Sequence, residues 1–175
     1  MTTIDQLLAK QEIYEVLIRY CRGIDRLDEE LVRACYQPDA VDNHGLYSGS
    51  VDHFVANAFA RQRKLVTACH YLQNVAIEIA GEAALAETYA IAVERGHTAE
   101  GALIDTIVGL RYVDRFERRD GGPWLIARRT VVIDWTKAEP VNEGWLAGKD
   151  FTRGVRDRSD LVYTETALLH PAPGR

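Results

Sequence analysis

The chain has 175 residues, of which 47% are hydrophobic and 27% charged, enough apolar material for one domain with its own core. Its 21 Lys and Arg residues against 26 Asp and Glu residues give a formal charge of −5, which argues against nucleic acid as a main partner, because phosphate binding needs a basic face. No apolar run reaches membrane-spanning length and no secretory signal is visible, so a soluble cytoplasmic protein without a membrane partner is expected.

The first third of the chain has the periodicity of helices. From Ile4 to Cys21 apolar residues recur at steps of three and four, which predicts an amphipathic helix that ends at Gly23. Two shorter helices are expected after it, one ended by Pro38 and one capped by Ser50. A short hairpin is expected between these two helices.

Four long segments rich in β-branched and aromatic residues follow, at 67–79, 83–94, 102–117 and 124–135. Short turns between consecutive strands predict antiparallel pairing. Helices first and a curved sheet afterwards is an α+β plan. We expect a cone-shaped barrel, made of a strongly curved antiparallel sheet with the N-terminal helices closing a central cavity. Residues 1–138 form this cone, and residues 139–175 form an arm that belongs to the same domain or to an oligomer interface.

Three stretches carry a resemblance to a known family. They are the run 20–25 (YCRGID), His70 with Asn74 on the first long strand, and the run 112–121 before Trp124. In this order they resemble the SnoaL-like branch of the nuclear transport factor 2-like superfamily. That branch has a cone fold of the α+β type. Its relatives include scytalone dehydratase, bile acid 7α-dehydratase, hexachlorocyclohexane dehydrochlorinase and the small subunits of ring-hydroxylating dioxygenases, so the fold alone does not give the reaction.

The resemblance implies catalytic roles for four residues. In the dehydratase and dehydrochlorinase relatives, an Asp after the first helix holds a strand His that removes a proton from carbon, and Asp25 and His70 match this pair. Tyr20 matches a tyrosine of the bile acid enzyme, and a phenol there can donate a proton to a leaving hydroxyl. Arg129 matches an arginine of the dehydrochlorinase, which implies that it holds developing negative charge. The bile acid enzyme's own arginine falls on Ile133 here, a departure from that enzyme's pattern.

Each of these residues also has a purely structural interpretation. Asp25 has the position of a cap for the second helix. His70 is the single polar residue in a stretch of apolar strand face, as a core histidine with satisfied hydrogen bonds is. Tyr20 lies near a helix end, where packing explains it equally well. Arg128 and Arg129 point to opposite faces of one strand, and a β-bulge would exchange them.

The function hypothesis is a cofactor-independent lyase of the dehydratase kind, or an isomerase, acting on a hydrophobic cyclic small molecule such as a steroid, polyketide or aromatic compound. An imidazole suits the base because its ordinary pKa of about 6.5 leaves it mostly neutral at pH 7. The alternative is a non-catalytic ligand-binding or accessory subunit, such as a dioxygenase small subunit. Eight residues are expected to line the pocket: Tyr14, Phe54, Phe59, Leu72, Asn74, Tyr89, Leu110 and Trp135.

No metal site is expected. Asp42, His44 and His53 match neither a zinc motif nor a triad of two histidines and one carboxylate. The three cysteines have no CxxC spacing, which argues against a disulfide framework. Cys69 is not paired with His70, because neighbours on a strand point to opposite faces, and it is expected to be a small buried hydrophobic residue.

A homo-oligomer is expected, with a trimer ahead of a dimer. The last two strands carry apolar residues on both faces, and such strands need cover on both sides. The chain has too few helices for a second layer, so another subunit or the arm has to supply it. The related dehydratases and the dehydrochlorinase are trimers packed through their sheets.

Overall fold

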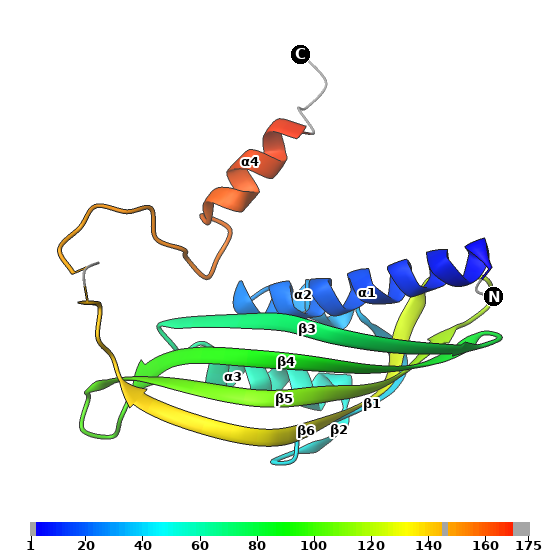
Figure 1. Ribbon diagram of the computed structural model, residues 1–175, viewed down its shortest axis with the longest axis horizontal. Coiled ribbons are helices and arrows are strands. Elements are labelled where there is room, and N and C mark those ends of the chain that lie inside the picture. Colours follow the sequence, from blue (N-terminus) through cyan, green and yellow to red (C-terminus); the bar gives the residue numbers. More distant parts are fainter. Residues whose placement is uncertain (1–2, 145–146, 170–175) are drawn as a thin grey trace.

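The computed structural model describes residues 3–144 and 147–169. Three N-terminal helices lie against one face of a six-stranded sheet (Figure 1). The helices are α1 (Ile4–Asp25), α2 (Glu29–Arg33) and α3 (Val51–Gln62). The strands are β1 (Tyr36–Asn43), β2 (Ser48–Ser50), β3 (Thr67–Ala80), β4 (Ala83–His97), β5 (Leu103–Arg118) and β6 (Trp124–Pro140).

The sheet is open and mixed, with the strand order β2-β1-β6-β5-β4-β3. All neighbouring strands pair antiparallel except β1 and β6, which pair parallel. The expectation of an α+β fold with N-terminal helices is confirmed. The sheet differs from the expected antiparallel barrel in two respects: it is open, with β2 and β3 as separate edges, and β1 pairs parallel with β6.

Helix α1 begins with a capping box, in which the Thr3 side chain and the Gln6 side chain each bond to the other residue's backbone N–H. The helix was expected to end at Gly23, but it continues to Asp25. Gly23 is needed for a different reason: a Cβ there would meet the Val32 side chain at 2.6 Å. The missing side chain therefore lets α2 pack directly on the last turn of α1.

The second helix is shorter than expected, because it ends before Tyr36 and Pro38 lies inside β1. Pro38 has no N–H for a sheet ladder, and the β1–β6 register shifts between Tyr36 and Val41. The cap of α2 is Asp28, whose carboxylate accepts the Leu31 N–H at 3.0 Å. Asp25 is therefore not used as that cap.

The face of the sheet that the helices cover, here called the inner face, carries the core. Alternate residues of β4 and β5, such as Ala86, Ala90, Tyr112 and Phe116, are buried there against α1 and α3. The opposite face, called the outer face, is formed by Glu87, Tyr89, Arg111, Asp134, Trp135 and their neighbours. Arg111 binds Glu87 at 2.8 Å and Asp134 at 3.0 Å. Cys69 is exposed on edge strand β3, not buried as expected.

The arm runs back from the end of β6 past the C-terminal end of α1. Its helix α4 (Leu161–Leu169) begins beside α1, where the Tyr163 ring lies 5.2 Å from the Arg22 guanidinium, and then projects away from the sheet (Figure 1). Two ion pairs join the arm to the end of α1 and the start of α2: Arg158 binds Asp28 at 3.1 Å, and Asp160 lies 3.5 Å from Arg26. Residues 145–146 and 170–175 of the arm lie outside the described residues. Among those described, no helix has both the length and the apolar character needed to cross a membrane.

Candidate active site

A cavity of about 280 Å³ lies between the inner face of the sheet and the helices. Most of its wall is apolar, with side chains such as Ile24, Phe54, Leu110 and Val131. The polar side chains of the wall are Tyr20, His44, Tyr47, Arg61, Gln62, His70, Glu94 and Tyr112. A mostly apolar hollow with a few convergent polar groups is typical of a small-molecule site.

Asp25 and His70 are in contact beside the cavity. Asp25 is the last residue of α1, and its carboxylate accepts the backbone N–H of His70 at 2.9 Å and contacts the ring Nδ1 at 2.7 Å. Only 13% of the Asp25 side chain and 8% of the His70 side chain are exposed. An ionised carboxylate at Nδ1 fixes the proton on that nitrogen and leaves Nε2 as the free acceptor of a ring that lines the cavity.

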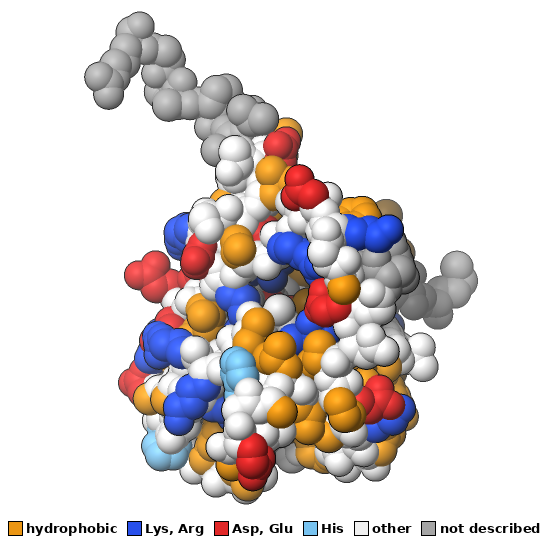
Figure 2. Space-filling model, turned by 90° about the vertical axis from the view of Figure 1, so that its left-hand side faces the viewer, with side chains coloured by type: hydrophobic (Ala, Val, Ile, Leu, Met, Phe, Trp, Pro, Cys, Tyr) orange, Lys and Arg blue, Asp and Glu red, His pale blue; other side chains and the backbone are white. Residues whose placement is uncertain are grey.

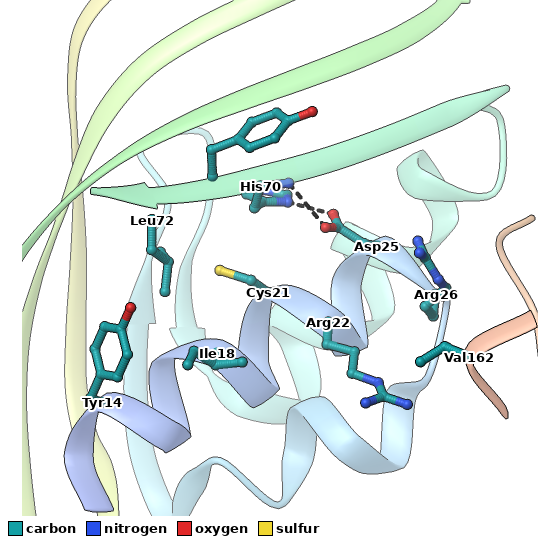
Figure 3. A pocket seen from close by; sticks show the side chains of 10 residues that line it. Tyr14, Ile18, Cys21, Arg22, Asp25, Arg26, His70, Leu72 and Val162 are labelled. Carbon is teal, nitrogen blue, oxygen red and sulfur yellow. Dashed lines mark hydrogen bonds and ion pairs between the residues drawn. The ribbon is translucent and has the colours of Figure 1, made fainter. Parts of the chain in front are cut away.

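A second hollow lies outside the cavity, between α1 and β3 (Figure 3). This groove has a volume of about 460 Å³ and is more open than the cavity. Figure 3 shows Asp25 reaching from the end of α1 to His70, with Arg22 and Arg26 beside it on the same helix. His70 lines both hollows, so the Asp25–His70 pair forms the wall between them.

Tyr20 lines the cavity and is almost completely buried. Burial raises the pKa of Tyr20 well above its ordinary value, and the nearby Arg129 cation opposes this only in part. The phenol therefore keeps its proton at neutral pH and is a hydrogen-bond donor or an acid, not a base.

Arg129 is fully buried, as expected of the inward-facing arginine, but it does not line the cavity. Its Nε and Nη2 bind the buried Asp114 carboxylate at 2.8 and 2.6 Å. The rings of Tyr20 and Tyr112 lie 4.0 and 4.1 Å from the guanidinium carbon and separate it from the cavity. Arg129 therefore does not contact a substrate in the cavity directly. Its positive charge acts on the Tyr20 ring instead.

A carboxylate also lies in the cavity wall. Glu94 is 6% exposed and accepts hydrogen bonds from Arg61 and Gln62, each at 2.8 Å. Burial alone would raise the pKa of Glu94, but the Arg61 ion pair and the Gln62 amide outweigh it and hold this pKa below its ordinary value. The cavity wall therefore holds a Glu94–Arg61 ion pair near His70.

A second histidine–carboxylate pair was missed by the sequence reasoning. His44 lines the cavity, and its Nδ1 is in close contact with the buried carboxylate of Asp42. In the sequence, Asp42 and His44 are candidates only for a metal site, which their spacing does not favour. In the described part of the chain, no group of three or more His, Cys, Asp or Glu residues is arranged to hold a metal ion. The available signal was the i, i+2 spacing, which places both side chains on one side of a strand end.

Five of the eight residues expected in the pocket are buried or line a hollow, but only two line the cavity. Phe54 and Leu110 form part of its wall. Tyr14 from α1 and Leu72 from β3 line the groove instead. Phe59 is fully buried in the core beneath α3.

The other three expected pocket residues point elsewhere, and this part of the prediction is wrong. Asn74 is exposed, because a register shift between Leu72 and Val75 breaks the alternation of β3. Tyr89 is 41% exposed on the outer face. Trp135 is 49% exposed and packs on Gly109 on the outer face, where a Cβ would meet the indole at 2.2 Å.

The SnoaL-like domain family matches residues 5–130 of the sequence, well over half of the chain. The chain belongs to this family. Among solved structures, a proposed scytalone dehydratase from Novosphingobium aromaticivorans is similar at 18% identity, with a TM-score of 0.67, over 83% of this chain and 97% of that one. A hexachlorocyclohexane dehydrochlorinase of type 2 is similar at 16% identity, with a TM-score of 0.66, over 86% and 97% of the two chains. No curated protein matches the sequence.

A protein from Kribbella flavida is as similar in fold, with a TM-score of 0.67 at 14% identity over 75% of this chain and 94% of that one. At these identities the comparisons show a shared fold. The proteins named as a scytalone dehydratase and a dehydrochlorinase share the fold, and the reaction of this chain has to be argued from the residues of its site.

Proposed function

We propose that this SnoaL-like protein is a cofactor-independent lyase or isomerase that removes a proton from carbon in a hydrophobic cyclic small molecule. The observation that carries the proposal is His70, whose ring lines an apolar cavity while its Nδ1 is held at 2.7 Å by Asp25. That contact orients the ring, fixes the tautomer and stabilises the imidazolium that forms when Nε2 takes a proton.

The remaining polar groups have consistent roles. Tyr20 supplies a neutral phenol that can donate to a leaving hydroxyl or to a substrate carbonyl. Arg129, stacked on the Tyr20 ring, favours negative charge developing on that oxygen. The apolar side chains of the wall exclude water and select a hydrophobic ring compound.

The test uses a panel of cyclic ketones in D₂O, with α-proton exchange followed by NMR, and the matching β-hydroxy ketones, with elimination followed by absorbance. His70→Gln and Asp25→Asn are expected to lower both rates by about 10²–10⁴-fold, the usual contribution of a positioned base. His97→Gln is the matched control, since His97 is exposed at the end of β4 and lines neither hollow. Wild-type rates that survive both site substitutions contradict the proposal.

A further inference from the structure

The cavity wall contains a second imidazole held by a second carboxylate. His44 follows β1 in the turn to β2, and its Nδ1 contacts Oδ1 of Asp42. The other carboxylate oxygen of Asp42 accepts the Tyr36 hydroxyl at 2.7 Å. The His44 ring stacks on Phe54, with centroids 4.5 Å apart and planes at 19°. The Asp42 carboxylate and the stacked Phe54 ring therefore hold the His44 ring in position.

The second ring nitrogen of His44, Nε2, lies close to Tyr20, the expected proton donor. His44 Nε2 lies 3.3 Å from the Tyr20 hydroxyl, and both side chains line the same cavity as His70. Asp42, His44 and Tyr20 thus form a continuous hydrogen-bonded chain that ends at the cavity.

The charges behind this chain decide in which direction its hydrogen bonds run. Asp42 and Asp114 are both fully buried, and neighbouring strands place Asp42 beside Arg129. Arg129 is the one guanidinium of this cluster among the described residues, and Asp114 takes two of its donors. Two buried carboxylates against one guanidinium leave one negative charge, and a buried charge without a counter-charge is costly. A proton on His44 removes that imbalance, and so does a proton on Asp114, because burial raises the pKa of that carboxyl.

The groups packed around His44 support this assignment. Tyr20 from α1, Tyr36 from β1 and Tyr47 from the turn before β2 are phenols with raised pKa values, chiefly through burial, so they remain neutral. Asp25, in contrast, lies near two cations, since Arg26 follows it in the chain and Arg156 binds its backbone oxygen at 3.1 Å. The carboxylate of Asp25 does not depend on its histidine for charge balance.

We propose that His44, protonated and held by Asp42, is the catalytic acid of the cavity and acts through the Tyr20 hydroxyl, opposite the base His70. This inference rests on the proposed function. In a dehydration, His70 Nε2 takes the proton from carbon and the C–H electron pair forms the double bond. The C–O bond breaks with its electron pair on oxygen, and the leaving hydroxyl takes the Tyr20 proton and departs as water. His44 Nε2–H returns a proton to the Tyr20 oxygen.

The first experiment needs no substrate. A two-bond ¹H–¹⁵N spectrum of the ¹⁵N-labelled full chain at pH 7, assigned against His44→Gln, reports both ring nitrogens of His44. Shifts typical of an imidazolium are expected. A neutral ring with a proton on Nδ1 alone, as when the buried charge is neutralised at Asp114 instead, overturns the proposal.

The second experiment compares two leaving groups on one cyclic ketone, a β-hydroxyl and a β-chloride, because chloride leaves without a proton. The ratio of kcat/KM for hydroxyl over chloride is expected to fall by about 10²-fold or more in His44→Gln and in Tyr20→Phe. The double variant Asp42→Asn/His44→Gln, which removes the buried charge together with the acid, keeps the test open if His44→Gln folds poorly.

The outcomes separate the two proposals. His70→Gln is expected to lower elimination of both leaving groups alike, and His97→Gln to leave the ratio unchanged. An unchanged ratio in all the His44 variants, with His70→Gln inactive, overturns the acid role and leaves the proposed function standing. A wild-type protein that eliminates neither group overturns both.

Discussion

Arg156 connects the arm to the active-site helix, and its replacement gives the sharpest test of what the arm does. The Arg156 guanidinium donates to the backbone oxygens of Ile24 and Asp25 at 3.2 and 3.1 Å. It also donates to the backbone and side-chain oxygens of Gln62, both at 2.6 Å, and to the Leu65 oxygen at 3.4 Å. These carbonyls are at the C-terminal ends of α1 and α3, where the helix dipole favours a cation.

The expected cost of Arg156→Met follows from these contacts. Burial lowers the pKa of Arg156, but a guanidinium keeps its charge at any accessible pH. Hydrogen bonds from a charged donor are worth about 1.5–3 kcal/mol each, and the effects are not additive. Because the site is half-buried and water can reach the released carbonyls, we expect a loss of about 2–4 kcal/mol in the free energy of unfolding. For a chain of this length, that lowers the melting temperature by roughly 4–16 °C.

Arg158→Met is the matched control, because Arg158 is on the same arm and makes a single exposed ion pair with Asp28. Such a pair is worth about 1 kcal/mol or less. Urea and thermal unfolding of both variants, followed by circular dichroism, give the comparison. A further expected effect of Arg156→Met is a shift of the His70 ring signals in the NMR spectrum, since Asp25 loses its backbone support. Equal stability of the two variants would refute the assignment of Arg156 as the anchor of the arm.

Four further outcomes are expected. Asp114→Asn replaces the carboxylate that accepts two hydrogen bonds from the buried Arg129 guanidinium and lowers the free energy of unfolding by about 1.5–3 kcal/mol, measured in urea. Gly109→Ala pushes Trp135 off the outer face, read as a change in tryptophan fluorescence at a cost of about 1–3 kcal/mol. The pKa of Glu94 in the folded protein is below its ordinary value of 4.5, so the ionised carboxylate stabilises the fold above pH 4.5 and this effect is lost as the pH falls through the folded-state pKa. In Glu94→Gln, the free energy of unfolding should therefore decrease less than in the wild type between about pH 5 and 3. Light scattering should show a homo-oligomer, a trimer ahead of a dimer, and a 19.7 kDa particle contradicts this.

The sequence predicts the helices and long strands well, because their signals are local. The apolar periodicity of α1 and the β-branched runs of β3 to β6 each lie within one segment, and the structure has an element at each. Gly23 shows the limit of local signals. A glycine near the end of a periodic run is typical of a helix end, yet here it serves the packing of Val32, which no local pattern contains.

The two histidine–carboxylate pairs show the same limit at the site. Asp25 and His70 are 45 positions apart, and only the family resemblance predicted their contact, which the structure has. Asp42 and His44 are two positions apart, but their meaning depends on burial and on a partner 24 positions away, Tyr20. A short spacing can be read from the sequence, whereas the cavity it faces cannot.

Two errors in the expected pocket, Asn74 and Trp135, have the same physical origin, because the register of the sheet shifts beside each of them. One shift in β3 moves the inner row from Leu72 to Val75, which leaves Asn74 exposed. In β6, a shift opposite Arg115 and Phe116 turns Arg129 inward where alternation from Trp124 points Arg128 inward. A third shift makes Ile133 the last cavity residue of β6. Bulges re-aim side chains and are common beside active sites, so strict alternation fails most at the residues that matter for function.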